Sequence, residues 1–275
     1  MHTSVVESGG TKSTWIHTDL YGNKKSFQTV GLHPYELTEE KEQKLLMQLN
    51  QNKFPLDHPL HFYGAGCESS VGKQRIKALL DNIGVKSHQV NSDLLGACIA
   101  CWGRDKGVTG ILGTGAITAE FDGIQILQTK SGLGYLLGDE GSGFDIGKRL
   151  LVHYFDNLLS KEISLDIEHY FNGSDQILPT IYGENGRFII AGLTKIVKSN
   201  EKNPIVKTLL KEAFHDFYKT AIEPLNTSSI KIVGSIGYHF KEPLTSSLAK
   251  KNISVTQVFQ DAASPLYDWH NQDNL

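Results

Sequence analysis

Five glycines fall within the twelve residues 132–143, where they surround the adjacent acidic residues Asp139 and Glu140. Glycine allows backbone turns that a side chain would forbid, so this segment is predicted to be a loop that holds a ligand. Neighbouring side chains of an extended segment point in opposite directions, and only one of the two carboxylates can therefore face one ligand. We expect Asp139 to face it and Glu140 to be structural.

The loop leads into a predicted amphipathic helix. Apolar residues recur at helical spacing from Ile146 to Leu159, and Ser142 is of a residue type that caps helix N-termini. An ordinary helix with a glycine-rich lead-in would show the same pattern. The other glycine turns of the chain favour the ligand-binding interpretation.

A second glycine turn, Gly9-Gly10-Thr11-Lys12, ends the first predicted strand and leads into a strand over 14–17. Small residues let backbone N–H groups approach an anion closely, and the Thr11 hydroxyl and the Lys12 ammonium are further donors. The turn lacks the spacing of a P-loop or of a dinucleotide-binding fingerprint. Taken alone, it could be only the tip of a hairpin.

A similar unit recurs about one hundred residues later, where Gly113, Thr114 and Gly115 follow a predicted strand. Both units continue as strand, tight turn, strand, and this repetition indicates an internal duplication. Duplicated halves would place two anion-binding turns face to face across one cleft. A third glycine turn, Gly234-Ser235, follows a predicted strand over 230–233.

Asp93 follows a predicted strand over 85–90 and precedes a predicted helix over 94–102. An earlier strand over 60–63 and a helix over 70–83 give an alternation that predicts an α/β fold with a partly parallel sheet. Functional loops of such sheets lie at the carboxyl ends of the strands. Asp93 is therefore either a helix cap or a general base, and an aspartate of ordinary pKa, about 3.9, is ionised at neutral pH.

Composition excludes several classes of partner. The 275-residue chain has a formal net charge of −3, which offers no basic field to nucleic acid or to an anionic membrane. No apolar run approaches the roughly 20 residues that span a bilayer, and the first residues show no secretion signal. We expect a cytoplasmic protein with no nucleic-acid or membrane partner.

Three cysteines do not suggest a disulfide framework. Cys98 and Cys101 have C-x-x-C spacing, but no second pair or suitably spaced histidine accompanies them. Their apolar surroundings predict a buried helix, in which cysteine behaves as a small apolar side chain. A metal or redox role is therefore disfavoured.

Together these motifs resemble those of the sugar kinases of the actin and hexokinase superfamily. More narrowly, the chain resembles the N-acetylglucosamine kinases and their bacterial relatives in the BadF/BadG/BcrA/BcrD ATPase group. The likeness extends through nearly the whole chain, and L-G-D-E-G-S-G at 137–143 is its most specific part. A single glycine turn proves little, but the order and spacing of five motifs is hard to obtain by chance.

The resemblance implies two actin-like (ribonuclease H-like) domains of the α/β class, with mixed sheets flanked by helices and a cleft between them for ATP and a sugar. The domains would span residues 1–93 and 94–261, and a tail over 262–275 would pack back on the first. The resemblance also implies a homodimer and phosphoryl transfer from ATP, with Mg²⁺, to a sugar hydroxyl.

Residue roles follow from the same resemblance. Asp93 would accept the hydroxyl proton, and Glu7 would contact Mg²⁺ through water. The ATP phosphates would be held by Gly9, Gly10, Thr11, Lys12, Gly113, Thr114 and Gly115, and the adenosine by Gly234 and Ser235. The sugar would be held by His33, Asp93, Ala116, Ile117, Gly132, Leu133, Gly134 and Asp139.

The chain departs from the family pattern in three places. His33 stands where the family usually has asparagine, and Ala116-Ile117 stands in place of a Ser-Asn pair. Loss of polar groups from a buried site could cost about 1 to 3 kcal/mol each, or could mark a different sugar, such as N-acetylmuramate or another hexosamine. Glu7 replaces the commoner aspartate but keeps its charge.

Three functions remain under consideration from the sequence. The leading one is an ATP-dependent kinase for an N-acetylated amino sugar, with N-acetylglucosamine as the first candidate. A catalytically silent nucleotide- or sugar-binding sensor is a second. An activator-type ATPase of the same superfamily is a third, although its relatives carry cysteines that ligate an iron–sulfur cluster.

Overall fold

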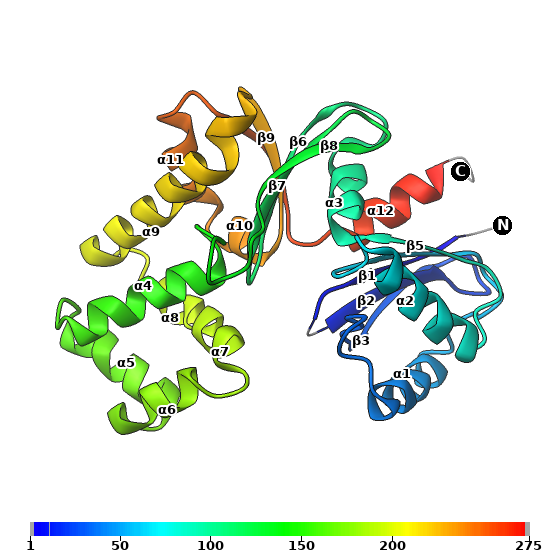
Figure 1. Cartoon of the computed structure of the whole chain (residues 1–275), viewed down its shortest axis with the longest axis horizontal. Coiled ribbons are helices and arrows are strands. Elements are labelled where there is room, and N and C mark those ends of the chain that lie inside the picture. Colours follow the sequence, from blue (N-terminus) through cyan, green and yellow to red (C-terminus); the bar gives the residue numbers. More distant parts are fainter. Residues whose placement is uncertain (1–2, 11, 273–275) are drawn as a thin grey trace. The chain divides into compact units, whose positions relative to one another are not determined.

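The computed structural model describes residues 3–10 and 12–272 (Figure 1). The chain divides into two compact units. Unit 1 comprises Met1–Asp105, Gly123–Gln125 and Asp261–Leu275, and unit 2 comprises Lys106–Asp122 and Ile126–Gln260. In the described ranges no helix has the length and apolar character required to cross a membrane.

Unit 1 is built on a five-stranded mixed sheet of order β3-β2-β1-β4-β5. The first three strands form an antiparallel meander, and β1, β4 and β5 run parallel. The strands are β1 (Ser4–Ser8), β2 (Lys12–Thr18), β3 (Lys24–Val30), β4 (Leu60–Gly64) and β5 (His88–Ser92). The helices are α1 (Glu39–Gln51), α2 (Ser70–Asn82), α3 (Asp93–Trp102) and α12 (Ala263–His270).

Unit 2 contains a second five-stranded mixed sheet, of order β10-β9-β6-β7-β8. Its strands are β6 (Gly107–Leu112), β7 (Ala116–Phe121), β8 (Ile126–Ser131), β9 (Ser229–Val233) and β10 (Ser254–Phe259). Its helices are α4 (Gly143–Phe155), α5 (Lys161–Phe171), α6 (Ile177–Ile181), α7 (Gly186–Gly192), α8 (Thr194–Ser199), α9 (Pro204–Phe217), α10 (Ser235–His239) and α11 (Lys241–Ala249).

The two sheets have the same topology. In each, a three-stranded antiparallel meander is followed by two strands that add in parallel beside the first strand of the meander. The predicted α/β class and the predicted internal duplication are therefore confirmed at the level of strand order. In both sheets the first strand lies at the centre and ends in a glycine turn.

The core of unit 1 explains why its meander is rigid. Trp15 on β2 is fully buried, and its ring packs edge-on against Phe54 with centroids 4.9 Å apart. The Trp15 indole N–H donates to Oγ1 of Thr29 at 2.9 Å. Because this buried polar group is satisfied, the large ring stabilises the sheet by burial without an unpaired donor.

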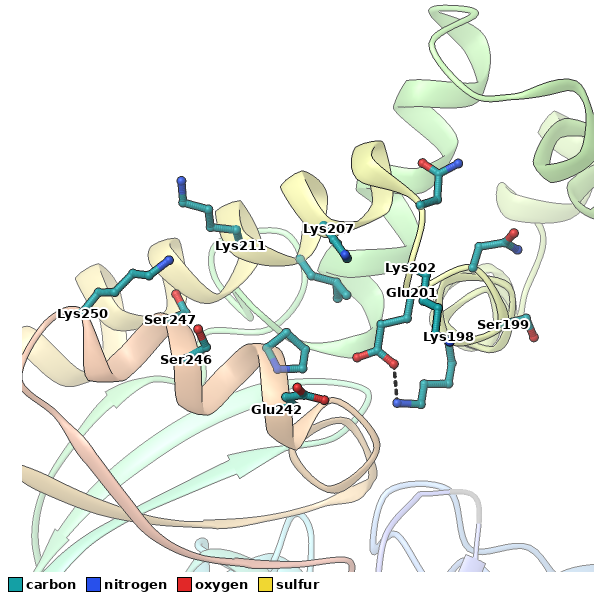
Figure 2. A pocket seen from close by; sticks show the side chains of 14 residues that line it. Lys198, Ser199, Glu201, Lys202, Lys207, Lys211, Glu242, Ser246, Ser247 and Lys250 are labelled. Atoms are coloured by element: carbon teal, nitrogen blue, oxygen red, sulfur yellow. Dashed lines mark hydrogen bonds and ion pairs between the residues drawn. The ribbon is translucent and has the colours of Figure 1, made fainter.

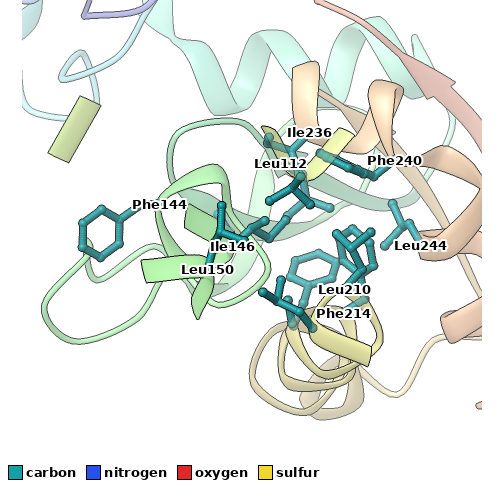
Figure 3. Close-up of a cluster of buried hydrophobic side chains, with 14 of the residues drawn as sticks. Leu112, Phe144, Ile146, Leu150, Leu210, Phe214, Ile236, Phe240 and Leu244 are labelled. Carbon is teal, nitrogen blue, oxygen red and sulfur yellow. The ribbon is translucent and has the colours of Figure 1, made fainter. Parts of the chain in front are cut away.

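The hydrophobic core of unit 2 contains side chains of β6 and of helices that lie far apart in the sequence (Figure 3). Leu112 and Ile146 are fully buried, and they belong to the same cluster as side chains from α9, α10 and α11. Those side chains include Leu210, Phe214, Ile236, Phe240 and Leu244. Leu112 is the last residue of β6, so the core fixes the point where the glycine turn begins.

Several predicted boundaries differ from the observed ones. The strand predicted over 85–90 begins only at His88. The backbone N–H of Val85 donates a hydrogen bond to the carbonyl of Leu80 in α2, so Val85 belongs to the end of that helix and not to the strand. The helix predicted over 187–197 is interrupted at Leu193, between α7 and α8. The helix predicted over 205–222 is α9, followed by one π-helical turn at Tyr218–Ile222.

The division between the units also falls later than the sequence suggested. It lies after Asp105 rather than after Asp93, because α3 packs against β4, β5 and α12 within unit 1. The last helix, α12, packs on β1 and β2 of the same unit. Asn271 follows α12, and its side-chain amide accepts from the N–H of Thr3 at 3.0 Å and donates to the Thr3 carbonyl at 3.1 Å.

Candidate functional site

The turn between β1 and β2 is a tight hairpin. The backbone N–H of Gly9 donates to the carbonyl of Lys12 at 3.0 Å. Oγ of the buried Ser8 lies 2.7 Å from Oγ of Ser13 and accepts from the N–H of Leu32 at 3.0 Å. The turn is thereby fixed to the segment after β3. Thr11, predicted to bind phosphate, lies outside the described residues.

Packing explains one glycine at this turn but not another. A Cβ on Gly31, which follows β3, would lie 2.3 Å from the carbonyl oxygen of Gly10, so packing requires glycine at 31. A Cβ on Gly10 would meet no atom within 4 Å, and neither Gly9 nor Gly10 has a positive φ. None of the described residues of unit 1 therefore requires glycine at 10, and the open side of the backbone fits the close approach of an anion.

Glu7, on β1, has a carboxyl group whose surroundings disfavour a negative charge. Burial raises its pKa to about 7, with further contributions from the neighbouring Asp261 and Asp93 and an opposing one from Lys12. Excess carboxylate charge of this kind suits a nearby cation. However, within residues 3–10 and 12–272 no three His, Cys, Asp or Glu side chains are grouped to bind a metal directly. The contact of Glu7 with Mg²⁺ through water stays a prediction, for which a carboxylate near the turn is suitable chemistry.

Asp93 is the first residue of α3, at the carboxyl end of β5. The cap of α3 is Ser92, whose Oγ accepts from the N–H of Leu95, while Asp93 accepts from the N–H of Leu94 at 2.8 Å. Capping therefore does not depend on Asp93. Burial and the nearby Glu68 raise the pKa of Asp93 to about 7. The expectation of an ordinary aspartate pKa was wrong, because that value belongs to a solvated carboxyl.

Glu68 was missed by the sequence analysis. It follows β4, which pairs in parallel with β5 so that Gly64 lies opposite Ser92. The loops after two adjacent parallel strands share one edge of the sheet, and they bring Glu68 within hydrogen-bonding reach of Asp93. In the sequence, the glycine turn after the predicted strand over 60–63 marked this loop. The pairing of that strand with the next one was not visible, so nothing connected Glu68 with Asp93.

His33 lies in the loop after β3, beside the turn after β4. A Cβ on Gly66 would lie 2.9 Å from its Nε2. Nδ1 of His33 is buried and has no hydrogen-bond partner among the described residues. The His33 ring lies 5.8 Å from that of Tyr35, whose hydroxyl is 2.9 Å from Oγ of Ser69. An unpaired buried nitrogen at this edge of the sheet suits a polar ligand.

In unit 2 the turn after β6 is held by the start of α4. The N–H of Gly113 donates to the carbonyl of Gly115 at 3.0 Å, as Gly9 does to Lys12 in unit 1. The N–H groups of Gly143 and Phe144 donate to the carbonyls of Gly113 and Thr114 at 2.8 and 3.2 Å. The loop over 132–143 and the turn at 113–115 are therefore one structure.

Asp139 is the centre of that structure. Its side chain is only 3 % exposed, and Oδ1 accepts from the backbone N–H of Ala116 at 3.1 Å. Its φ of +65° makes it one of few non-glycine residues in the left-handed region. Burial raises its pKa, while the Ala116 hydrogen bond and the Arg187 charge oppose that rise. Arg187, on α7, was not predicted and lies 5.8 Å from the ring of Tyr135.

The other acidic residues of this region fasten the loop. Oδ2 of Asp145 accepts from the N–H of Gly141 at 3.0 Å and from Nε of Arg149 at 2.9 Å. Oε2 of Glu140 lies 3.3 Å from Oγ1 of Thr220, at the π-helical turn. As predicted, Ser142 caps α4, through a hydrogen bond from the N–H of Asp145 at 3.2 Å.

The remaining predicted sugar residues of unit 2 lie beside Asp139 but offer few polar groups. Gly132 donates its N–H to the carbonyl of Ala116 at 3.0 Å. A Cβ on Gly132 would lie 2.6 Å from Cδ1 of Ile117, so this side chain fills the space against Gly132. Leu133 is 68 % exposed, and Gly134 has a positive φ of 79°.

Gly234 lies beside the turn at 113–115, and Ser235 is the first residue of α10. A Cβ on Gly234 would come 2.3 Å from the carbonyl oxygen of Leu112 and 3.3 Å from the N–H nitrogen of Gly113. The N–H of Gly234, whose φ is +119°, donates to the carbonyl of Phe259 at 3.0 Å. Packing therefore requires this glycine, and it brings α10 against the end of β6.

The predicted residues thus gather within each unit. Unit 1 brings together Glu7, the turn at Gly9, Gly10 and Lys12, and Asp93, with His33 at the same edge of the sheet. Unit 2 brings together Gly113, Thr114, Gly115, Ala116, Ile117, Gly132, Asp139 and Gly234.

No family model and no curated protein matches the chain. Solved structures do match. A putative N-acetylglucosamine kinase from Porphyromonas gingivalis is 26 % identical with a TM-score of 0.91, over 99 % of this chain and all of that one. A putative N-acetylglucosamine kinase from Chromobacterium violaceum is 17 % identical with a TM-score of 0.74, over 98 and 99 % of the two chains.

A more distant match extends the comparison. A glucokinase of the ROK family from Streptomyces griseus, solved with glucose and AMPPNP, is 14 % identical with a TM-score of 0.58, over 98 % of each chain. The matched structures define the fold as that of the two-domain sugar kinases of the actin and hexokinase-like superfamily. The predicted fold class and the predicted resemblance to these sugar kinases are confirmed. The similarity over the whole chain supports kinase activity in general.

Proposed function

We propose that this protein is an ATP-dependent kinase that phosphorylates a hydroxyl group of an N-acetylated amino sugar, with N-acetylglucosamine as the first candidate. The observation that carries the proposal is the whole-chain match to the Porphyromonas gingivalis protein, at a TM-score of 0.91. The site residues support it independently, because each unit carries a glycine turn after its first strand and unit 1 also carries a candidate base.

In the proposed reaction Asp93 takes the proton of the attacking sugar hydroxyl. A bond forms between the hydroxyl oxygen and the γ-phosphorus, the bond between that phosphorus and the β,γ-bridging oxygen breaks, and ADP leaves. Such a transition state spreads negative charge over the phosphoryl oxygens, and backbone N–H groups stabilise it. The raised pKa of Asp93, about 7, is near the pH at which a general base works best.

The turn at Gly9, Gly10, Thr11 and Lys12 is assigned to the phosphates, as is that at Gly113, Thr114 and Gly115. Among the described residues, none accepts a backbone hydrogen bond from the N–H groups of Thr114 and Gly115. Bound Mg²⁺ would neutralise phosphate charge. Glu7 is assigned to its water shell, where its raised pKa falls once a cation is near.

Asp139 is assigned to the sugar, as an acceptor for its hydroxyl groups. The hydrogen bond from Ala116 and the neighbouring Arg187 both favour its charged, acceptor-only form. The backbone of 132–134 and the His33 imidazole are assigned to the sugar's remaining polar groups. Gly234 and Ser235 are assigned to the adenosine.

A sensor without catalysis remains the second candidate, and one contact favours it. Ile117 occupies the space against Gly132, where the family pattern has an amide side chain. The activator-type ATPase is less favoured. Cys98 and Cys101 are buried on α3, and burial of this kind suits packing rather than a shared cluster.

The test is ADP release with ATP and Mg²⁺ across N-acetylglucosamine, N-acetylmuramate, N-acetylmannosamine, glucosamine and glucose. Turnover on an N-acetylated sugar that Asp93→Asn abolishes supports the kinase and identifies its substrate. Asp81→Asn, at an exposed carboxylate on α2, is the matched control and should retain activity. Nucleotide binding without turnover on any of these sugars would favour the sensor.

A further inference from the structure

A groove in unit 2 is rich in lysine (Figure 2). It has a volume of about 910 Å³ and runs along the end of α8, the segment 200–203, α9 and α11. Ligand pockets typically measure about 300 to 1,000 Å³, so the groove is large enough for a small molecule. None of the residues assigned to ATP or the sugar lines it.

The groove carries positive charge in a chain that is negative overall. Five of its 14 lining residues are lysines, against two glutamates, whereas the whole chain has a formal net charge of −3. The lysines are Lys198, Lys202, Lys207, Lys211 and Lys250. Lys207 and Lys211 lie one turn apart on α9, an arrangement of like charges that destabilises a helix unless an anion compensates.

Most of this charge has no partner within the protein. In residues 3–10 and 12–272 no carboxylate forms an ion pair with Lys202, Lys207, Lys211 or Lys250. Lys198 differs, because its Nζ contacts Oε2 of Glu201 at 2.5 Å and donates to the carbonyl of His239 at 2.6 Å. Lys198 therefore closes one end of the groove, and the other lysines are available to a ligand.

The lining selects among anions. Besides the lysines and the two glutamates, its polar groups are the hydroxyls of Ser199, Ser246 and Ser247 and the amides of Asn200 and Asn203. The Ser199 hydroxyl and the Asn200 amide already donate to the carbonyls of Lys195 and Ile196, which leaves Ser246, Ser247 and the Asn203 amide group as further donors. Ammonium, hydroxyl and amide groups donate hydrogen bonds, and phosphate oxygens only accept them. No aromatic or arginine side chain lines the groove, so the stacking that single-stranded nucleic acid needs is absent from it.

A protein partner fits the lining poorly as well. Interfaces depend on a few large apolar or aromatic anchors that are desolvated on binding. The apolar residues of this lining are Leu210, which is already buried in the core, and Pro243. We propose that the groove between α9 and α11 binds a small compound with several phosphate charges, such as an organic di- or triphosphate.

The test is a footprint of lysine amines on the whole protein in Mg²⁺-free buffer. Acetylation rates are measured for each lysine by mass spectrometry, with inorganic tripolyphosphate as the probe and sodium sulfate at equal ionic strength as its control. Tripolyphosphate should slow the labelling of Lys207 and Lys211 about fivefold or more, because several charge-assisted contacts form together. Sulfate should not, and Lys44 and Lys77, exposed on unit 1, should be unaffected by either.

A pair of double variants locates the binding. Lys207→Gln with Lys211→Gln should weaken tripolyphosphate affinity by about tenfold in the calorimetric component assigned to the groove, whereas Lys44→Gln with Lys77→Gln should not. Equal protection by sulfate, or equal protection of all exposed lysines, would overturn the proposal. Protection of Lys12 alone would also overturn it, and would instead place the phosphate at the turn after β1. The groove proposal does not depend on kinase activity, so the two can fail separately.

Discussion

A methyl group on Gly115 would lie 2.9 Å from Oδ2 of Asp139 and 3.1 Å from Oδ1. Asp139 cannot easily move away, because it is buried and bonded to the Ala116 N–H. Gly115→Ala should therefore displace Asp139 and raise the KM for the sugar by about tenfold or more, with a loss of stability of about 1 to 3 kcal/mol. Steady-state kinetics and urea unfolding measure the two effects, and an unchanged KM would contradict the assignment of Asp139.

Gly113→Ala is the matched comparison, because a Cβ at that position would meet no atom within 4 Å and the residue has no positive φ. This variant should fold with unchanged stability. If the turn holds phosphate, the added methyl should still raise the KM for ATP by about tenfold, since it occupies space that the ligand needs. A variant with full stability and normal ATP kinetics would remove the turn from the site.

The rate should depend on pH through Asp93. Its raised pKa, about 7, means that the carboxyl is protonated and inactive as a base below that pH, so kcat/KM should fall as the pH drops below about 7. Glu68 is one cause of the raised value. Glu68→Gln should move the acidic limb of the profile to lower pH, whereas a purely structural role for Glu68 would lower the rate without moving the limb.

Stability should decline as the pH rises, because of Glu7. Its folded-state pKa of about 7 lies above the ordinary value of 4.5, so the folded protein binds a proton more tightly than the unfolded chain does. The resulting stabilisation is complete below about pH 4.5 and is lost as the pH rises through about 7. Without Mg²⁺, Glu7→Gln should make the protein more stable than wild type at pH 8, by about 1 to 3 kcal/mol, and should flatten the pH dependence. Urea unfolding at several pH values measures this, and parallel curves for the two proteins would refute it.

Patterns that are local in sequence predicted the elements well. The Ser142 cap follows from residue type, and the repeated glycine turns predicted two related sheets. Predictions failed where a backbone group has a partner distant in the chain. Lys86 donates its N–H to the carbonyl of Leu56 rather than to a neighbouring strand. The strand β5 therefore begins only at His88.

The sequence indicated the glycines and Asp93 of the candidate site. It did not indicate the charged side chains that act on them. Glu68, Asp261 and Arg187 act on the predicted residues from other segments, and no sequence spacing relates them. The pKa values could not be predicted either, because they depend on burial. Only the paired strands β4 and β5 could have indicated Glu68 in advance.

The hydrogen bonds between Thr3 and Asn271 have a consequence for biosynthesis. Unit 1 contains both the first strand and the last helix of the chain, so a ribosome must make all of unit 2 before α12 can complete the first sheet's packing. Tyr63 of β4 reaches that helix through a hydrogen bond to His270 at 2.8 Å. A nascent chain that stops short of α12 therefore carries Asp93 and the glycine turn after β1 on an unfinished scaffold.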